Sequence, residues 1–175
     1  MDQTIDVIDQ VIAAAGQLSA AKKIHNDIKP TNLLYLKSET GYEIKLSDFG
    51  QAGKMGGTPG WTAPVFHRRR QSGKEDFFSV GWVCLRLLCK SKELFLSLRD
   101  NYVEDTNAPW MTAFHGLLEI EFVYKLVNLN LTPTIEQVND HWKRIRSSVQ
   151  MIDISRLLAI GVPRNSLRLQ LERPR

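Results

Sequence analysis

Hydrophobic residues recur along the first part of this chain with two different spacings. Within residues 3–20, Ile5, Ile8, Ile12 and Ala15 follow one another at steps of three and four. This spacing predicts an amphipathic helix with one buried face. The runs LLYLK and YEIKLSD, separated by SETG, predict two short strands joined by a turn.

The second part of the chain is patterned for helices. The run FFSVGWVCLRLLC, within residues 76–89, is apolar almost all round, as expected of a central buried helix. A loop or short helix follows, and Thr132 or Thr134 lies near the start of a later helix. Three further helices are predicted, at residues 112–128, 134–147 and 149–162.

The predicted fold class is therefore mainly α, with a small β element near residues 33–47. Residues 50–64 contain five glycines and two prolines, a density that predicts an irregular loop between the strands and the central helix. At 175 residues the chain has the length of one domain, and a domain of this size can bury a sufficient core.

Charge, apolar content and cysteine placement narrow the possible kinds of protein. A net charge of +4 does not by itself indicate nucleic-acid binding. The first helix carries Asp2, Asp6 and Asp9 in place of a basic signal segment, and no apolar run reaches membrane-spanning length. Cys84 and Cys89 lie in one apolar stretch and are predicted to be free buried thiols, which favours a cytoplasmic location.

Candidate chemistry lies in the loop that follows the first helix. The run HNDIKPTN supplies an acid at Asp27, a cation at Lys29 and an amide oxygen at Asn32. Asp48 adds a second hard oxygen donor at the end of the second strand. Phosphoryl transfer needs an acid near the attacking hydroxyl, a cation near the phosphate and oxygen ligands for magnesium.

Five motifs in this order resemble those of the eukaryotic protein kinases. HNDIKPTN resembles the catalytic loop HRDLKxxN, SDFG resembles the DFG element, and GTPGWTAP resembles the end of the activation segment. DFFSVG is similar to the start of the buried F helix, and TPTIEQVNDHW to the end of the large lobe. GTPGWTAP is also similar to the endoplasmic-reticulum stress-sensing kinase/ribonucleases. The resemblance implies a large lobe over residues 1–147 and a helix with a basic tail over 148–175.

The resemblance also implies roles for single residues. Asp27 would be the catalytic base, and Lys29 would contact the phosphate. Asn32 and Asp48 would hold the magnesium of magnesium-ATP. Thr58 would hydrogen-bond toward Asp27 and Lys29, a pairing that the resemblance associates with serine/threonine kinases. The implied catalytic set is Asp27, Lys29, Asn32 and Thr58.

The chain departs from the family pattern at a few positions. Asn26 stands where many members have an arginine that pairs with a phosphate in the activation segment. Val65 and Thr132 stand where members carry a glutamate and an arginine that form a buried ion pair. Losing both partners of such a pair can be nearly neutral, whereas losing one is costly. Asp76 fits the pattern and would cap the catalytic loop from the central helix.

Only 24 residues precede His25, too few for the small lobe with which the family clamps ATP. The expectation is a kinase-like large lobe without the small lobe, with weak or absent magnesium-ATP binding and no efficient phosphoryl transfer by the chain alone.

Three functions stay open. The first is a pseudokinase-type binding or scaffold module, or a kinase fragment, with a protein partner or self-association at the exposed cleft floor. The second is a serine/threonine kinase completed by a small lobe from missing sequence or another chain. The third is binding of RNA or an acidic partner through the basic residues 67–70, although nucleic acid is not the expected partner.

Overall fold

The computed structural model describes residues 2–39, 41–54, 56–64, 74–100, 102, 116–131 and 133–162. In chain order its elements are α1 (Asp2–Ala20), η1 (Pro30–Asn32), β1 (Leu33–Ser38), β2 (Gly41–Leu46), η2 (Phe49–Gln51), α3 (Lys74–Leu88), α4 (Lys92–Asp100), α6 (Leu118–Val127), α7 (Ile135–Ile145) and α8 (Ile154–Ala159). The fold is mainly helical with one two-stranded antiparallel sheet in the described residues, which confirms the predicted class.

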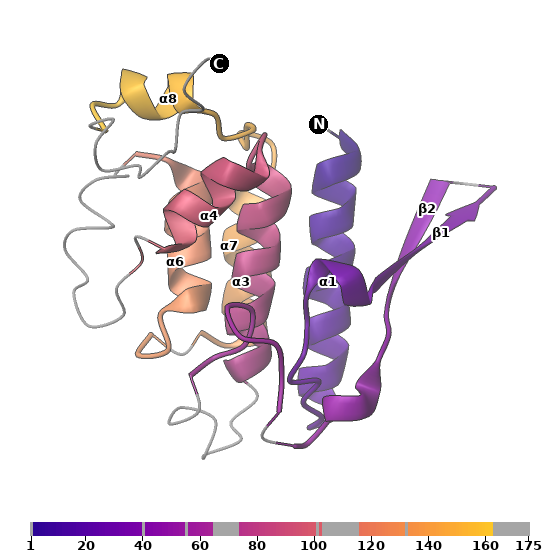
Figure 1. Cartoon of the computed structure of the whole chain (residues 1–175). Helices are drawn as coiled ribbons and strands as arrows, with labels where there is room; N and C mark the ends of the chain where they lie inside the picture. Colours follow the sequence, from indigo (N-terminus) through magenta and orange to yellow (C-terminus); the bar gives the residue numbers. More distant parts are fainter. Residues whose placement is uncertain are drawn as a thin grey trace, which may run out of the picture.

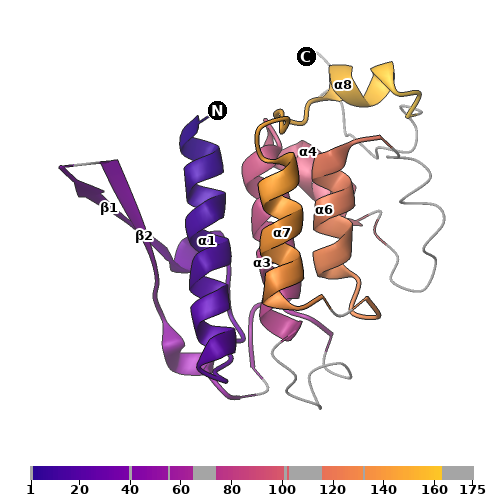
Figure 2. The ribbon, with the colours of Figure 1, turned by 180° about the vertical axis from the view of Figure 1, so that it is seen from behind.

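Helix α3 is the centre of the domain and packs against α1, α4 and α6 (Figure 1). Seen from behind, α7 runs alongside α3, between α1 and α6, and contacts both of them (Figure 2). The β1–β2 hairpin extends along the outer side of α1, away from α3, in both views. The chain therefore places the hairpin and the loops around it at one edge of a helical bundle.

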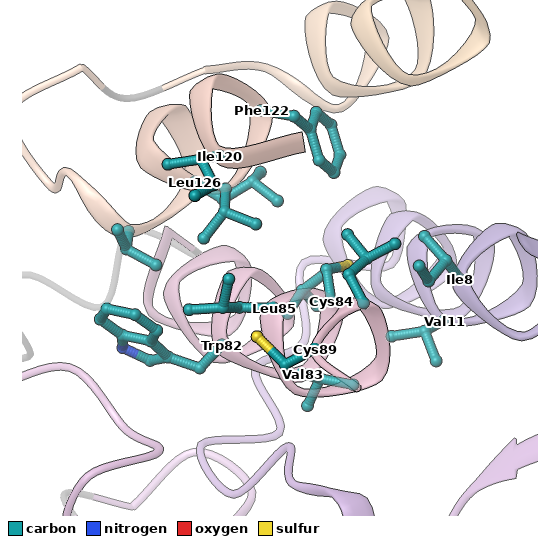
Figure 3. Close-up of a cluster of buried hydrophobic side chains, with 14 of the residues drawn as sticks. Ile8, Val11, Trp82, Val83, Cys84, Leu85, Cys89, Ile120, Phe122 and Leu126 are labelled. Atoms are coloured by element: carbon teal, nitrogen blue, oxygen red, sulfur yellow. The ribbon is translucent and has the colours of Figure 1, made fainter. Parts of the chain in front are cut away.

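The core is built around α3, as its apolar sequence predicts. Trp82, Cys84 and Leu85 are each exposed by 2% or less, and they meet side chains of α1 and α6 (Figure 3). Gly81 allows α6 to approach, because a Cβ there would lie 2.9 Å from the Cβ of Leu126. Burial raises the pKa of the Cys84 and Cys89 thiols to about 12, and both cysteines are free. The buried thiols are therefore protonated at neutral pH and serve as core side chains.

The hairpin is tied to α1 by one amide side chain. Gln10 accepts a hydrogen bond from the N–H of Ile44 at 2.7 Å and donates to the carbonyl of Tyr42 at 3.0 Å. Ile44 is buried, whereas Leu34 and Tyr35 are about half exposed, at 48% and 50%. The hairpin thus buries only part of its apolar surface against α1.

The C-terminal helix is shorter than predicted. A helix over all of residues 149–162 is wrong, because α8 begins at Ile154 after the N-cap Asp153. Ile152 instead pairs in parallel with Cys89, donating its N–H to the carbonyl of Leu88 at 2.8 Å. The buried pattern of this segment comes from a β-bridge followed by a short helix.

The other helices agree with the sequence within their described parts. Helix α7 begins after Thr134, which forms a capping box with Gln137, and α4 is the short helix allowed after residue 90. The predicted 112–128 helix is described only from residue 116, and α6 begins at Leu118. Among the described helices none is both long enough and apolar enough to cross a bilayer.

Candidate active site

The candidate catalytic loop lies between α1 and β1 along the chain, and a side chain of α3 binds its backbone. The side chain of Asp76, in the first turn of α3, accepts the backbone N–H of His25 at 2.8 Å and that of Asn26 at 2.9 Å. Burial raises the pKa of Asp76, and the two hydrogen bonds offset part of that rise. The capping contact expected of Asp76 is therefore present, and it fixes the loop on the central helix.

Asp27, Lys29 and Thr58 form a closed set of contacts, although Thr58 lies far along the chain from the loop. The Lys29 ammonium is 2.7 Å from Asp27 Oδ2 and donates to the Thr58 hydroxyl at 2.6 Å. The backbone N–H of Thr58 donates to Asp27 Oδ1 at 2.8 Å. Both contacts expected of Thr58 are thus present.

This contact set controls the charge of Asp27. Burial alone would raise the pKa of the Asp27 carboxyl, but the hydrogen bonds from Lys29 and Thr58 and the charge of Lys29 outweigh it. The pKa of Asp27 therefore lies below its ordinary value of 3.8. At neutral pH the site holds a carboxylate that can accept hydrogen bonds.

Asn32 and Asp48 are brought together by the residue between the second strand and Asp48. Ser47 donates both its N–H and its hydroxyl to the carbonyl of Asn32, at 2.9 and 3.0 Å. The Asn32 amide nitrogen donates to the Asp27 carbonyl at 2.9 Å and to Asp27 Oδ2 at 3.2 Å. This arrangement directs the Asn32 amide oxygen away from Asp27.

Asp48 is exposed and has a left-handed backbone, with φ of 60°. One carboxylate oxygen accepts the N–H of Gly50 at 3.3 Å, and the other remains available in the described structure. An amide oxygen and a carboxylate oxygen are the donor types that magnesium prefers. The described residues contain no cluster of three or more His, Cys, Asp or Glu suited to a metal, so these two side chains suit an ion whose remaining ligands are phosphate and water.

His25 supports the loop from inside. Its Nδ1 accepts the N–H of Asp27 at 3.3 Å, so the proton is assigned to Nε2, which donates to the carbonyl of Ser47 at 3.0 Å. The imidazole also contacts the ring of Phe49 at a centroid distance of 4.6 Å. Phe49 nevertheless remains 51% exposed, so His25 is a packing residue beneath an open aromatic surface.

Two supporting contacts were not predicted from the sequence. Asn26 adopts a left-handed conformation with φ of 65°, and its amide donates to the carbonyl of Lys54. Gly57 passes so close to the loop that a Cβ would lie 2.4 Å from the Asn26 carbonyl oxygen. The glycine density of the loop and the tolerance of asparagine for this conformation were the available signals.

Some positions that the sequence analysis singled out are not among the residues that the structure describes. Val65, Thr132 and the basic residues 67–70 lie outside the described residues. The site residues that the structure does describe are the catalytic loop, Asp48, Thr58 and Asp76 on α3.

The helical bundle, its edge hairpin and the contacts of Asp27, Lys29 and Thr58 define a kinase-like domain. The family model for the protein kinase domain matches residues 1–115, about two thirds of the chain, and the chain belongs to this family. The match includes every residue of the candidate site.

Curated relatives agree with this assignment. The chain is 37% identical over 93 residues to a calcium/calmodulin-dependent protein kinase type 1 of Caenorhabditis elegans, covering 48% of this chain and 27% of that protein. It is 37% identical over 92 residues to the human type 1B kinase, covering 47% and 27%. It is 24% identical over 185 residues to myosin light chain kinase A of Dictyostelium discoideum, covering 95% and 63%. The chain therefore spans about a quarter of the length of its calmodulin-dependent relatives.

Proposed function

We propose that this polypeptide provides the acceptor side of a serine/threonine protein kinase active site. The observation that carries the proposal is the closed contact set in which Lys29 bridges Asp27 and Thr58. Two groups of the catalytic loop and one from a distant part of the chain meet there, with a carboxylate at the centre. An arrangement that only stabilised a turn would not need the lysine to reach the distant threonine.

Each residue has a defined part in the proposed chemistry. Asp27 accepts a hydrogen bond from a serine or threonine hydroxyl and takes its proton as the hydroxyl oxygen bonds to the γ-phosphorus of ATP, while the bond from that phosphorus to the bridging oxygen breaks and ADP leaves. Lys29 places a positive charge beside the phosphoryl oxygens, and Thr58 holds Lys29 at that position. Asn32 and Asp48 would supply oxygen ligands for a magnesium ion bound with ATP; ATP would supply the phosphoryl group, and the ion would neutralise its charge.

Efficient transfer also needs groups that hold the nucleotide from the opposite side. We propose that a nucleotide-clamping lobe, from further sequence or from another chain, completes the site. Without that lobe, this polypeptide binds magnesium-ATP weakly and transfers the phosphoryl group slowly. Positioning of reactants contributes on the order of 7–11 kcal/mol to enzymatic barriers, so removing half of the contacts strongly slows the reaction.

The surface that would receive such a lobe is the cleft floor, defined by Leu34, Phe49 and the groove between α1 and β2. The groove has a volume of about 540 Å³, and Ala14, Ile44 and Phe49 are among the residues that line it. Leu34 and Phe49 are 48% and 51% exposed. Exposed apolar side chains beside a groove are typical of protein interaction surfaces.

The same surface favours a second candidate function, that of a pseudokinase-type scaffold. In that case the cleft floor binds a protein partner or a second copy, and the retained catalytic residues only stabilise the loop. The two functions differ in whether magnesium-ATP binds at Asp48.

Thermal unfolding of the purified chain with millimolar magnesium-ATP tests the proposed function. We expect a raised unfolding temperature, because a ligand that binds only the folded state stabilises it. Asp48→Ala should abolish the shift, whereas Asp6→Ala, which removes an exposed carboxylate of α1, should retain it. No shift in the unaltered chain would refute nucleotide binding by this polypeptide and leave the scaffold function.

A further inference from the structure

We propose that the pocket beside Lys29 is a specificity subsite for an acidic side chain of the substrate peptide, next to the residue that accepts the phosphate. The inference rests on the proposed function and names its substrate class. It would make this protein an acid-directed serine/threonine kinase domain, because the subsite shares one wall with the catalytic loop.

The composition of the pocket indicates an anionic ligand. It has a volume of about 250 Å³, and among the residues that the structure describes its lining includes Lys29, Arg86, Lys92 and Arg99 but no acidic residue. These cations come from three separate elements, the catalytic loop, α3 and α4, and converge on one small space. A carboxylate entering it would meet several donors at once, and hydrogen bonds between charged groups are the strong ones.

The far wall of the pocket is rigid. Trp61 stacks on Phe95 with ring centroids 5.4 Å apart, and the Arg99 guanidinium lies 5.4 Å from the centroid of the Phe95 ring. Phe95 is 2% exposed, so the core holds both the tryptophan and the arginine in place. A fixed guanidinium loses little freedom when it binds a carboxylate.

Lys29 is already paired with the buried Asp27, so the cations open to a ligand are those of α3 and α4, and the acids near them are exposed. Asp100 lies 3.2 Å from Arg99, but its side chain is 56% exposed, and such pairs are weak in water. Glu93 is exposed, one residue from Lys92, and its pKa is lowered by hydrogen bonds from its own backbone and from Ser91, with smaller effects from Lys92 and Arg86. Among the described residues neither Arg86 nor Lys92 forms a salt bridge within 4.0 Å.

The position of the pocket fits a peptide substrate. Lys29 lines it while contacting Asp27 and Thr58. The backbone N–H of Trp61 donates to the Thr58 carbonyl at 3.1 Å. A peptide whose hydroxyl reaches Asp27 therefore brings a neighbouring side chain to the pocket. The cations gather around one space with an aromatic wall, which suits a single side chain better than the extended backbone of a nucleic acid.

Fluorescence anisotropy with labelled peptides tests the subsite on the full chain without nucleotide. Three peptides share one central serine and carry glutamate, glutamine or lysine beside it. We expect the glutamate peptide to bind about tenfold more tightly than the glutamine peptide, the gain of roughly one strong charged hydrogen bond. The lysine peptide should bind most weakly. Equal affinities for the three peptides would overturn the proposal.

Matched variants locate the effect. Arg86→Gln with Lys92→Gln should remove the preference for glutamate, whereas Lys37→Gln with Lys45→Gln removes the same charge from the exposed hairpin and should leave the preference unchanged. Lys92 is exposed, so Lys92→Gln alone provides a folded variant if the double variant is unstable, with an expected loss of about threefold. Equal losses in the pocket and hairpin variants would assign the preference to net charge and overturn the subsite.

Three further outcomes separate this proposal from the alternative functions. If a generic single-stranded RNA binds the unaltered chain more tightly than the glutamate peptide and loses affinity in the pocket variant, the pocket binds nucleic acid and the proposal is wrong. A magnesium-ATP shift without a glutamate preference overturns the subsite alone. A glutamate preference without a nucleotide shift supports a pocket for acidic peptides and refutes nucleotide binding by this polypeptide.

Discussion

At the scale of single residues, Asp27 is the group on which the proposed chemistry depends. Its carboxylate accepts a backbone N–H from Thr58 and contacts Lys29 and Asn32 while its side chain is only 6% exposed. A buried carboxylate is stable when its neighbours donate to the charged form. The same contacts that prepare Asp27 for a substrate hydroxyl therefore also contribute to folding.

The charge of Asp27 predicts a pH-dependent stability. We expect Asp27→Asn to lower the free energy of unfolding at neutral pH by about 1.5–3 kcal/mol, the range for hydrogen bonds to charged groups. Because the pKa of the folded state lies below the ordinary value of 3.8, the contribution is complete above that value and disappears as the pH falls through the folded pKa. Urea unfolding of both proteins, at pH 7 and on the acid side of pH 3.8, measures the difference.

Asp76 titrates in both proteins and must be separated from this effect. Its pKa is raised, so protonation favours the folded state and Asp76 alone would add stability as the pH falls. The comparison between the unaltered chain and Asp27→Asn cancels this contribution. A difference that stays constant through the acid range would contradict the lowered pKa of Asp27.

At the scale of elements, the contact between α3 and the catalytic loop fixes the site. We expect Asp76→Ala to destabilise the protein by about 1–3 kcal/mol for each buried N–H left without an acceptor, those of His25 and Asn26. Asp76→Asn keeps one acceptor oxygen and should lose less. Urea unfolding measures both, with Ser79→Ala as a control in the same helix, where the hydroxyl bonds only the Glu75 carbonyl. Equal stability of Asp76→Ala and the unaltered chain would refute the capping role.

The C-terminal segment is anchored by a second contact between elements. Glu119 of α6, 1% exposed, accepts from Arg156 of α8 and from the N–H of Gln150 at 2.7 Å. We expect Arg156→Ala to cost about 3–5 kcal/mol, because it leaves a buried carboxylate without its cation. Lys90→Ala removes a pair with Asp153 whose lysine is 57% exposed and should cost at most about 1 kcal/mol. Similar losses in the two variants would contradict the difference in burial.

Periodicity predicts elements better than it predicts contacts. The apolar run of α3 depends on neighbouring residues, so the sequence alone was sufficient for it, whereas the sequence left the start of α7 open between Thr132 and Thr134 and the structure has the cap at Thr134. The β-bridge between Cys89 and Ile152 joins residues 63 positions apart, and a helix over residues 149–153 has the same local pattern. Long-range hydrogen bonding decides between the two.

The candidate site shows the same division. The contacts of Thr58 with Asp27 and Lys29 were implied by the resemblance to protein kinases, because no local spacing brings residues 27 and 58 together. The hydrogen bonds from Ser47 to the Asn32 carbonyl and from Asn26 to the Lys54 carbonyl involve backbone acceptors. Their partners depend on the path of the chain, which no residue type specifies.

At the scale of the whole molecule, two unlike surfaces contact the catalytic loop. One is the basic pocket, which Lys29 lines. The other is the apolar cleft floor, where Phe49 packs on His25 of the loop. The two surfaces share no described lining residue, so substitutions can test them separately.

Association through the cleft floor is the prediction that belongs to this scale. We expect the purified chain to self-associate as its concentration rises, because Phe49 exposes apolar area at the groove and Leu34 exposes it on β1, opposite the groove residue Lys45 of β2. Leu34→Glu should reduce this association by placing a charge in the apolar contact. Leu131→Glu is the matched control, since Leu131 is 49% exposed against 48% for Leu34 and lies beyond α6, outside the cleft floor. Sedimentation velocity over a range of concentrations distinguishes the two variants. A strictly monomeric unaltered chain, or equal effects of the two substitutions, would show that the cleft floor does not mediate self-association.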